Sequence, residues 1–391
     1  MQLGHGGTQD VNSEQRKTKP AGNSALCALT AAAAFLGLQT SNTHAEAAPE
    51  RASISFKYLD YQDYQPDSNR IHVAAPTVAL TVPVAGEWAI NTSYIVDTIT
   101  GASPLYHDSN LTKMSDRREA YTAGATRYLP TANFNVNAAY STESDYISRS
   151  LSASVNFFSE DKNTTYTVGV GSSNDTIIGS SIGRKSKETV DAVIGVTKIL
   201  GVSDIVQGTY RKSMGQGYFS DQYKLLDTRP DYRNIDSVLF RWNHYLKDAD
   251  ATVRSSYRYY QDSFDIRSHT IGLEYVQRMK DGWTFMPLVR YYSQSSASFY
   301  FDPDSGGGAP LADITAAIAA NGYASMDQRL SSFGAITYGA KLTKTFGRDW
   351  IVDLKIEKYE QRGEWALSNG SSGLSPFHAR SIQIGFTHFF D

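Results

Sequence analysis

The sequence has 391 residues, a formal net charge of −3 and a mean hydropathy of −0.38, with 25 Tyr, 17 Phe and a single Cys. The near-neutral charge, without a basic domain or basic tail, excludes the electrostatic footprint that nucleic-acid-binding proteins carry. Apart from a short N-terminal run, no window offers the roughly 20 apolar residues that a membrane-spanning helix requires.

The N-terminal segment has the pattern of a secretory signal peptide. Basic residues precede an apolar run at 24–38, and a polar stretch with small residues follows it up to Ala45. This order of basic, apolar and small-residue regions predicts cleavage after Ala45. We therefore predict a signal peptide at residues 1–45 and a single exported domain at residues 46–391. That domain contains no cysteine, because Cys27 lies in the signal, so it forms no disulfides.

The rest of the chain is a succession of segments in which apolar and polar residues alternate. Strict alternation predicts strands with one apolar and one polar face. We predict sixteen strands, at residues 51–62, 70–82, 87–99, 117–129, 131–142, 145–158, 163–174, 187–200, 204–215, 235–247, 250–262, 266–279, 282–296, 329–346, 349–362 and 377–391. Every second connection is short, as at 83–86, whereas the others are often long, as at 101–116, 175–186 and 297–328. Short turns on one rim and long loops on the other are typical of outer-membrane barrels.

The two faces of these strands predict what surrounds them. Ile384 and Phe386 of the last strand alternate with small or polar residues, while Asp353 and Glu357 share one face of the strand before it. Charges on alternate residues are costly in a dry core but ordinary in a wet lumen. We predict an all-β fold, a transmembrane antiparallel up-and-down β-barrel of about 16 strands with apolar faces toward lipid and polar faces toward the lumen.

Two further features fit this barrel. Trp88, Trp283 and Trp350 each follow a short turn, where the aromatic girdle of the periplasmic interface is expected. A short helical candidate at 311–321 lies inside the longest loop, and we expect it to rest at the mouth of the barrel.

A group of arginines marks a candidate solute path. The parity of their apolar neighbours places these residues on the lumen face, together with Glu274: Arg211, Arg241, Arg254, Arg258 and Arg290. Adjacent strands lie about 4.8 Å apart, so the arginines can form a ladder that attracts anions. In the alternative interpretation they pair with lumen carboxylates, Glu274, Asp353 and Glu357, and only brace the wall.

Other chemistry has weaker signals. Asp302 and Asp304 lie in a glycine-rich turn that begins like a calcium loop, but the glutamate that completes such a loop is missing. Asp97, His107 and Asp108 are the nearby candidates for a barrel hydrolase, and no serine-containing elbow accompanies them. We therefore predict no metal site, no cofactor and no enzymatic activity.

Several segments carry distinctive sequences. They include DTITGASP at 97–104, GYFSDQYK at 217–224, DTRPDYR at 227–233 and DQRLSSFG at 327–334. In these segments the chain resembles a family of Gram-negative proteins of unknown function that are regarded as outer-membrane barrels. The resemblance covers nearly all of the predicted exported domain, and it implies fold and compartment but no chemistry.

We expect a porin-like channel or transporter that passes small hydrophilic solutes across the outer membrane. A structural sheath or scaffold for a periplasmic or redox partner is the alternative, and a barrel enzyme is less expected. The expected partners are outer-membrane lipid and the barrel assembly machinery, with no nucleic acid. The identity of the solute, a periplasmic partner and a homo-oligomer are left open.

Overall fold

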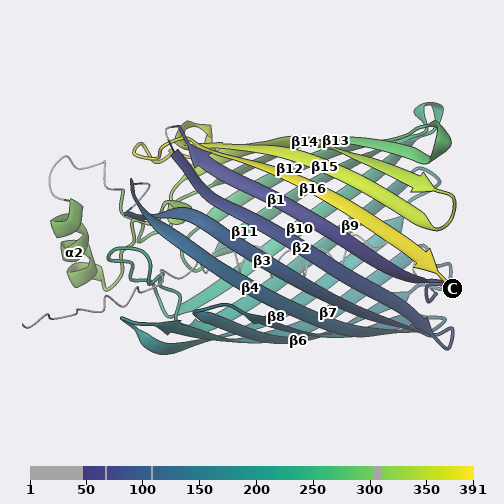
Figure 1. The fold of residues 1–391 in the computed structure, drawn as a ribbon, viewed down its shortest axis with the longest axis horizontal. Coiled ribbons are helices and arrows are strands. Elements are labelled where there is room, and N and C mark those ends of the chain that lie inside the picture. The colour runs from purple at the N-terminus through teal and green to yellow at the C-terminus, as the bar shows by residue number, and fades with distance from the viewer. Residues whose placement is uncertain (1–46, 67, 107–108, 303–309) are drawn as a thin grey trace, which may run out of the picture.

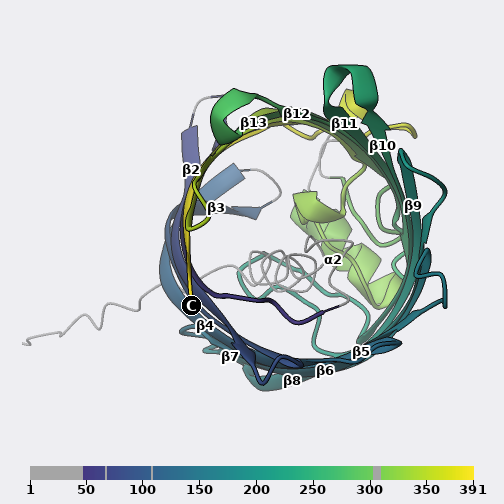
Figure 2. The same ribbon diagram turned by 90° about the vertical axis from the view of Figure 1, so that its right-hand side faces the viewer.

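The computed structural model describes residues 47–391 except 67, 107–108 and 303–309, so the predicted signal peptide lies outside the described residues. In this part of the chain, sixteen antiparallel strands close into one barrel. Each strand pairs with its neighbours in sequence, and β1 pairs with β16 (Figures 1 and 2). The predicted fold class is confirmed. No helix within the described residues is long and apolar enough to cross a membrane.

The strands match the predicted ones closely. They are β1 (Ala52–Gln65), β2 (Ser68–Val84), β3 (Trp88–Tyr106), β4 (Ser109–Tyr128), β5 (Ala132–Thr142), β6 (Tyr146–Phe158), β7 (Thr164–Gly179), β8 (Gly183–Ile199), β9 (Asp204–Gly217), β10 (Tyr232–Leu246), β11 (Ala251–Asp262), β12 (Arg267–Arg278), β13 (Trp283–Gln294), β14 (Phe333–Phe346), β15 (Trp350–Arg362) and β16 (Phe377–Phe390). The helices are α2 (Pro310–Asn321) and the 3₁₀ turns η2 (Lys247–Ala249), η3 (Lys280–Gly282), η4 (Gln328–Leu330) and η5 (Gly363–Trp365). The helical candidate in the longest loop thus corresponds to α2.

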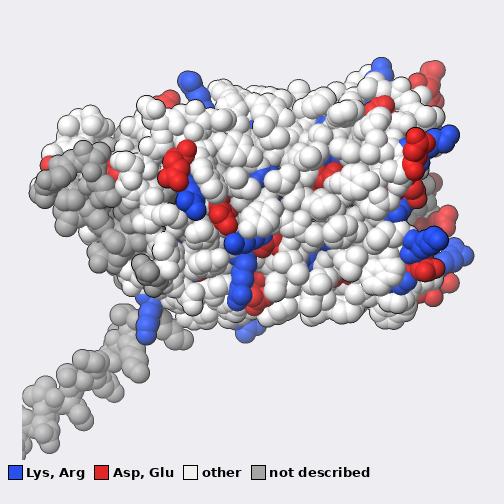
Figure 3. Space-filling view, turned by 90° about the horizontal axis from the view of Figure 1, so that it is seen from above, with Lys and Arg blue, Asp and Glu red and all other residues white. Residues whose placement is uncertain are grey.

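Apolar side chains cover the outside of the barrel. Val168, Val170, Val238, Phe240 and Phe386 are each between 43% and 60% exposed, and their neighbours of opposite parity are mostly polar. White side chains cover most of the wall in Figure 3, and charged ones gather at the short-turn rim on its right. An apolar surface of this extent is unfavourable in water and suits the hydrocarbon of a bilayer.

Three tryptophans stand at the short-turn rim, as predicted. Trp88, Trp283 and Trp350 are the first residues of β3, β13 and β15, and all three are exposed. The ring of Trp350 stacks on that of His388, with their centroids 4.1 Å apart. Lys344 lies over Trp283 at 5.0 Å from the centroid. Aromatic rings with a polar or cationic partner are typical of a membrane–water interface.

A cluster at the same rim joins the two ends of the barrel. Residues Ala52 and Ser53 pair with Phe390 and Phe389 in the β1–β16 ladder. The Arg51 guanidinium donates to Asp391 at 2.9 Å, to Asp349 at 2.8 Å, and to the carbonyls of Arg348 and Phe389. The residue after the final aromatic therefore contributes an ion pair across the seam.

Deleting residues 389–391 is expected to lower the yield of folded barrel sharply. The deletion removes two ladder pairs and the Asp391 carboxylate, so the edge of β1 loses its partner at the rim. The heat-modifiable band on a semi-native gel measures the folded fraction. Asp391→Asn keeps the ladder and serves as the control, which we expect to fold nearly normally. An undiminished folded band in the truncated chain would contradict a role for this end in closure.

Two predicted loops are wrong. The predicted loop at 101–116 is a hairpin, because β3 continues to Tyr106 and β4 begins at Ser109. Likewise β7 and β8 extend to Gly179 and from Gly183, which leaves a turn where we predicted a loop at 175–186. Gly101 has a φ of +126° and lies close to the Arg70 carbonyl, a geometry that a residue without a side chain allows, so the strand continues past it. One predicted strand is shorter, since β14 begins at Phe333 rather than at residue 329.

Candidate functional site

The candidate solute path is the polar inner face of β9 to β13. Phe240 and Trp242 point outward from β10, so Arg241 between them points inward, and the same parity applies to the other four predicted arginines. Arg211 pairs with Asp191 at 2.8 Å, and Arg254 lies 3.7 Å from Glu274. These two arginines have the bracing contacts of the alternative interpretation.

The other three arginines have no carboxylate within 4.0 Å in the described part of the chain. Arg241 donates to Gln207 at 3.2 Å, and Arg258 lies 3.4 Å from the Thr270 hydroxyl. Arg290 is exposed and makes neither a hydrogen bond nor an ion pair with any described residue. These uncompensated cations give this wall an excess of positive charge.

The carboxylates expected to brace the wall have other partners. Asp353 lies 3.3 Å from Lys341, and Glu357 lies 2.9 Å from Lys355. All four residues belong to β14 and β15, so their charges cancel locally. Glu274 alone, of the three carboxylates considered, contacts an arginine of the ladder.

Across the lumen, the wall formed by β3 to β5 is polar but uncharged at mid-height. Its inward positions there carry amide, hydroxyl or hydrogen side chains: Asn91, Ser93, Thr122, Gly124, Thr126, Asn133, Asn135 and Asn137. In the closed ring of sixteen strands, β3 to β5 lie opposite β11 to β13. The lumen therefore has one cationic wall and one neutral, hydrogen-bonding wall.

Three connections lie across the loop end of the barrel, and we call their described residues the plug. The plug consists of residues 218–231, 295–302, 310–332 and 363–376 (Figure 2). Gln294 on β13 donates to the carbonyl of Ser331 at 2.7 Å, and Ser332 and Ser371 bond to one another at 2.9 and 3.0 Å. Ile314 of α2 is fully buried against Met326.

A buried ion network holds the plug together. Asp327 is 1% exposed and accepts hydrogen bonds from Arg229 at 2.7 Å and from Arg329 at 2.7 Å. Arg329 also pairs with Asp221, and Arg229 lies 2.9 Å from Asp227. The arginines keep the pKa of Asp327 well below its usual range despite its burial. Two separate loops, 218–231 and 295–332, are thus joined through one carboxylate.

The network is also tied to the barrel wall. Arg70 on β2 donates to Gln328 at 2.9 and 3.0 Å when the amide oxygen of Gln328 is turned toward it. Arg70 lies 4.0 Å from Asp63 on β1 and 4.8 Å from the ring centroid of Phe377. This ion network was not predicted from the sequence, although each of its two loops carries an Asp-x-Arg sequence, at 227–229 and at 327–329.

A belt of tyrosines lies beneath the plug on every second strand. Each tyrosine hydroxyl donates to the side chain two residues further on: Tyr260 to Asp262 at 2.6 Å, Tyr292 to Gln294 at 2.7 Å, Tyr359 to Gln361 at 2.7 Å and Tyr61 to Asp63 at 3.1 Å. Tyr260 packs against an apolar cluster that includes Leu330 of the plug, and Tyr292 and Tyr359 pack against one that includes Leu374. The sequence signal for this tyrosine belt is the repeated Tyr-x-Asp or Tyr-x-Gln pattern, which our sequence analysis missed.

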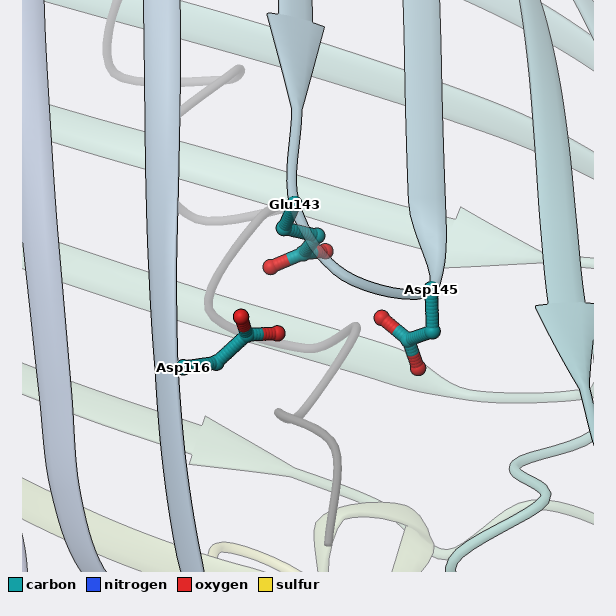
Figure 4. A group of neighbouring side chains, drawn as sticks. All are labelled: Asp116, Glu143 and Asp145. Carbon is teal, nitrogen blue, oxygen red and sulfur yellow. The ribbon is translucent and has the colours of Figure 1, made fainter. Parts of the chain in front are cut away.

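Three carboxylates meet near the mouth. Asp116 on β4 faces Glu143 and Asp145 of the β5–β6 turn, and one oxygen of each lies within 4.8 Å of the others (Figure 4). Oxygen ligands of this kind suit Ca²⁺ or Mg²⁺. The plug occupies part of the group, because Tyr223 and Gln222 donate to Asp145.

The weaker sequence candidates do not come together. Asp302 is not part of this carboxylate group, and Asp304 lies outside the described residues. Asp97 pairs with Arg118 in a buried cross-strand contact, so its carboxylate is engaged. His107 and Asp108 lie outside the described residues.

Comparison with known proteins confirms the family that the sequence resembles. A family model described as "Protein of unknown function (DUF3570)" matches residues 25–109, 106–182 and 179–377. No curated protein matches the sequence.

Solved structures show the same kind of fold. A bacterial polysaccharide outer membrane secretin is similar with a TM-score of 0.51 at 8% identity, covering 87% of this chain and 99% of that one. The siderophore receptor PirA from Pseudomonas aeruginosa has a TM-score of 0.46 at 8% identity, covering 88% and 81%. Pseudomonas aeruginosa OccK1 has a TM-score of 0.45 at 9% identity, covering 87% and 98%. At such identities the likeness concerns the fold alone, which is that of outer-membrane barrels.

Proposed function

We propose that this chain, which belongs to the family described as Protein of unknown function (DUF3570), is an outer-membrane channel for small anionic solutes with a plug at its outer mouth. The observation that carries the proposal is the uncompensated charge of Arg241, Arg258 and Arg290 on the lumen wall. Cations on a pore wall raise the local concentration of anions and favour their passage. A sixteen-stranded barrel is also wide enough to leave an aqueous channel between its walls.

The plug supports a channel that opens and closes. Buried ion pairs hold it in one arrangement, yet such pairs contribute little net stability because desolvation opposes their attraction. Tyrosines of the belt pack against two apolar clusters that include Leu330 and Leu374 of the plug. Many of the plug's contacts with the wall are directional hydrogen bonds, which suits an element with two discrete positions.

Ion entry into proteoliposomes tests the proposal. The full exported chain is reconstituted, and chloride and potassium entry are followed with separate fluorescent indicators. We expect chloride to enter faster than potassium, and both faster than in protein-free vesicles. Because a docked plug slows entry, the Asp327→Asn variant is measured beside the wild type. If neither protein admits ions, the channel proposal is wrong and the scaffold alternative is favoured.

The plug is expected to dock least firmly between about pH 6 and about pH 8. Burial raises the pKa of Asp145 from its ordinary 3.8 to about 6; the hydrogen bond from Tyr223 opposes this rise, and the charge of Asp116 adds to it. Docking then loses stability as the pH rises through 6, because the docked state holds the proton more tightly. Burial lowers the pKa of Lys224 from 10.5 to about 8, so docking regains stability as the pH rises above 8.

Single-channel open fractions measured at about pH 5, 7 and 9 check this expectation. The open fraction is expected to be highest at the middle pH. The Asn side chain of Asp145→Asn cannot ionise. We therefore expect this variant to lose the decrease in open fraction between neutral and acidic pH, and to keep the decrease at alkaline pH. An open fraction that does not vary with pH in the wild type would show that neither group is linked to docking.

A further inference from the structure

Five residues lie on one line across five strands in the middle of the cationic wall. In the strand registers, Arg241 pairs with Ser256, Ser256 with Gly272, Gly272 with Arg290, and Arg290 with Thr337. Two arginines without carboxylate partners therefore flank two small residues. Since adjacent strands lie about 4.8 Å apart, the two arginine backbones are about 14 Å apart.

Further arginines complete the surroundings of this line. Arg258 lies two residues above Ser256 on the same face of β11, and Arg254 lies two residues below it. Arg254 is compensated by Glu274, whereas Arg258 is not. The Nε atom of Arg258 is buried and has no hydrogen-bond partner within the described residues. A buried polar atom left in this state calls for a ligand or water to satisfy it.

The floor between the arginines is shallow because its residues are small. At Gly272 a Cβ atom would lie 2.7 Å from the Ser256 hydroxyl, so the absence of a side chain there leaves that hydroxyl in its place. We call the set Arg241, Ser256, Arg258, Gly272 and Arg290 the cradle. Its rim is cationic, its floor offers a hydroxyl, and it opens toward the neutral amide and hydroxyl wall of β3 to β5.

We propose that the cradle binds a polyhydroxylated anion, a monosaccharide that carries a carboxylate or a phosphate. Guanidinium groups recognise the anionic group by charge-assisted, often bidentate hydrogen bonds. The Ser256 and Thr270 hydroxyls and the Asn and Ser side chains across the lumen match the sugar hydroxyls, which a simple anion does not possess. The inference rests on the proposed function, because it names the class of solute for the same path.

Calorimetric titration of the full exported chain in detergent tests the cradle. The probes are glucuronate, glucose 6-phosphate, glucose and acetate. At least one of the first two is expected to bind roughly tenfold or more tightly than both glucose and acetate. The stronger of those two shows whether carboxylate or phosphate is the preferred anionic group. Equal affinity for glucuronate, glucose 6-phosphate and acetate would overturn the proposal.

Matched variants locate the binding. Arg290→Gln removes an exposed, uncompensated guanidinium and is expected to weaken binding roughly tenfold or more. Arg211→Gln removes the same charge from the lumen outside the cradle and is expected to change the affinity less than about twofold. Ser256→Ala is expected to weaken glucuronate more than acetate, because only the sugar uses that hydroxyl. Equal losses in Arg290→Gln and Arg211→Gln would mean a diffuse charge effect and would overturn the cradle.

The calorimetric titration tests the cradle, and the ion-entry assay tests the channel, so either proposal can be rejected without the other. Specific binding without ion entry would keep the cradle and reject the channel. Ion entry without preferential binding would keep the channel and reject the cradle.

Discussion

Replacing Asp327 by Asn is expected to open the mouth of the barrel and raise the single-channel conductance of the protein. Asp327 is buried and accepts from Arg229 and Arg329, so the change leaves these two partly buried guanidinium groups without a shared counter-charge. Breaking a buried ion pair by removing one partner costs about 3–5 kcal/mol. A loss of that size weakens plug docking by about 100-fold or more.

Planar-bilayer recordings measure this effect as a longer open time and a larger mean current. Asp313→Asn is the matched control, because Asp313 is an exposed residue of the same loop on α2. The barrel itself is expected to stay folded, since the β1–β16 ladder is untouched. If Asp327→Asn conducts like the wild type and like Asp313→Asn, the ion network does not hold the plug.

Replacing Arg241, Arg258 and Arg290 together by Gln is expected to shift the reversal potential in a salt gradient strongly toward cations. The three residues supply the arginine charge on β9 to β13 that has no ion-pair partner. Without them, Arg211 and Arg254 remain, and each is paired with a carboxylate. Changes of lumen residues tune selectivity while the lipid-facing wall keeps the barrel stable.

A second triple variant controls for net charge. Arg117, Arg127 and Arg149 lie on the outer parity of β4 and β6, and their replacement by Gln removes the same number of charges from outside the lumen. We expect the reversal potential of this control to match the wild type within error. An equal shift in both triple variants would assign selectivity to the overall charge of the protein rather than to the wall.

The strands could be predicted from the sequence because lipid imposes a two-residue period on each of them. For example, the predicted strand at 131–142 is β5, Ala132–Thr142, whose Phe134 and Val136 are exposed on the outer face. The period fades above the membrane, where neither face meets lipid. That is where the prediction of a loop at 101–116 was wrong and the β3–β4 hairpin was missed.

The site could be predicted only in part. Strand parity alone places each arginine on a face, but it does not give the register between strands. The line from Arg241 through Ser256 and Gly272 to Arg290 exists only once three ladders are known. The predicted bracing partners Asp353 and Glu357 proved to face Lys341 and Lys355 for the same reason.

The plug depends on contacts that local sequence does not encode. Asp327 meets Arg229 over a separation of 98 residues, and Tyr223 meets Asp145 over 78 residues. Neither loop has a periodic pattern, so the sequence predicts its length and its helix but not its partners. The Tyr-x-Asp and Tyr-x-Gln repeat is an exception, because strand alternation places both residues of each pair on one face.

The reversal potential of the wild-type chain in a planar bilayer under a potassium chloride gradient tests the central claim most directly. We predict discrete channel openings and a reversal potential whose sign shows that chloride passes in preference to potassium. Asp327→Asn is predicted to give the same sign with a larger current, because the lumen wall is unchanged. A reversal potential that favours potassium, or the absence of current in both proteins, would contradict an anion-selective channel with a plug.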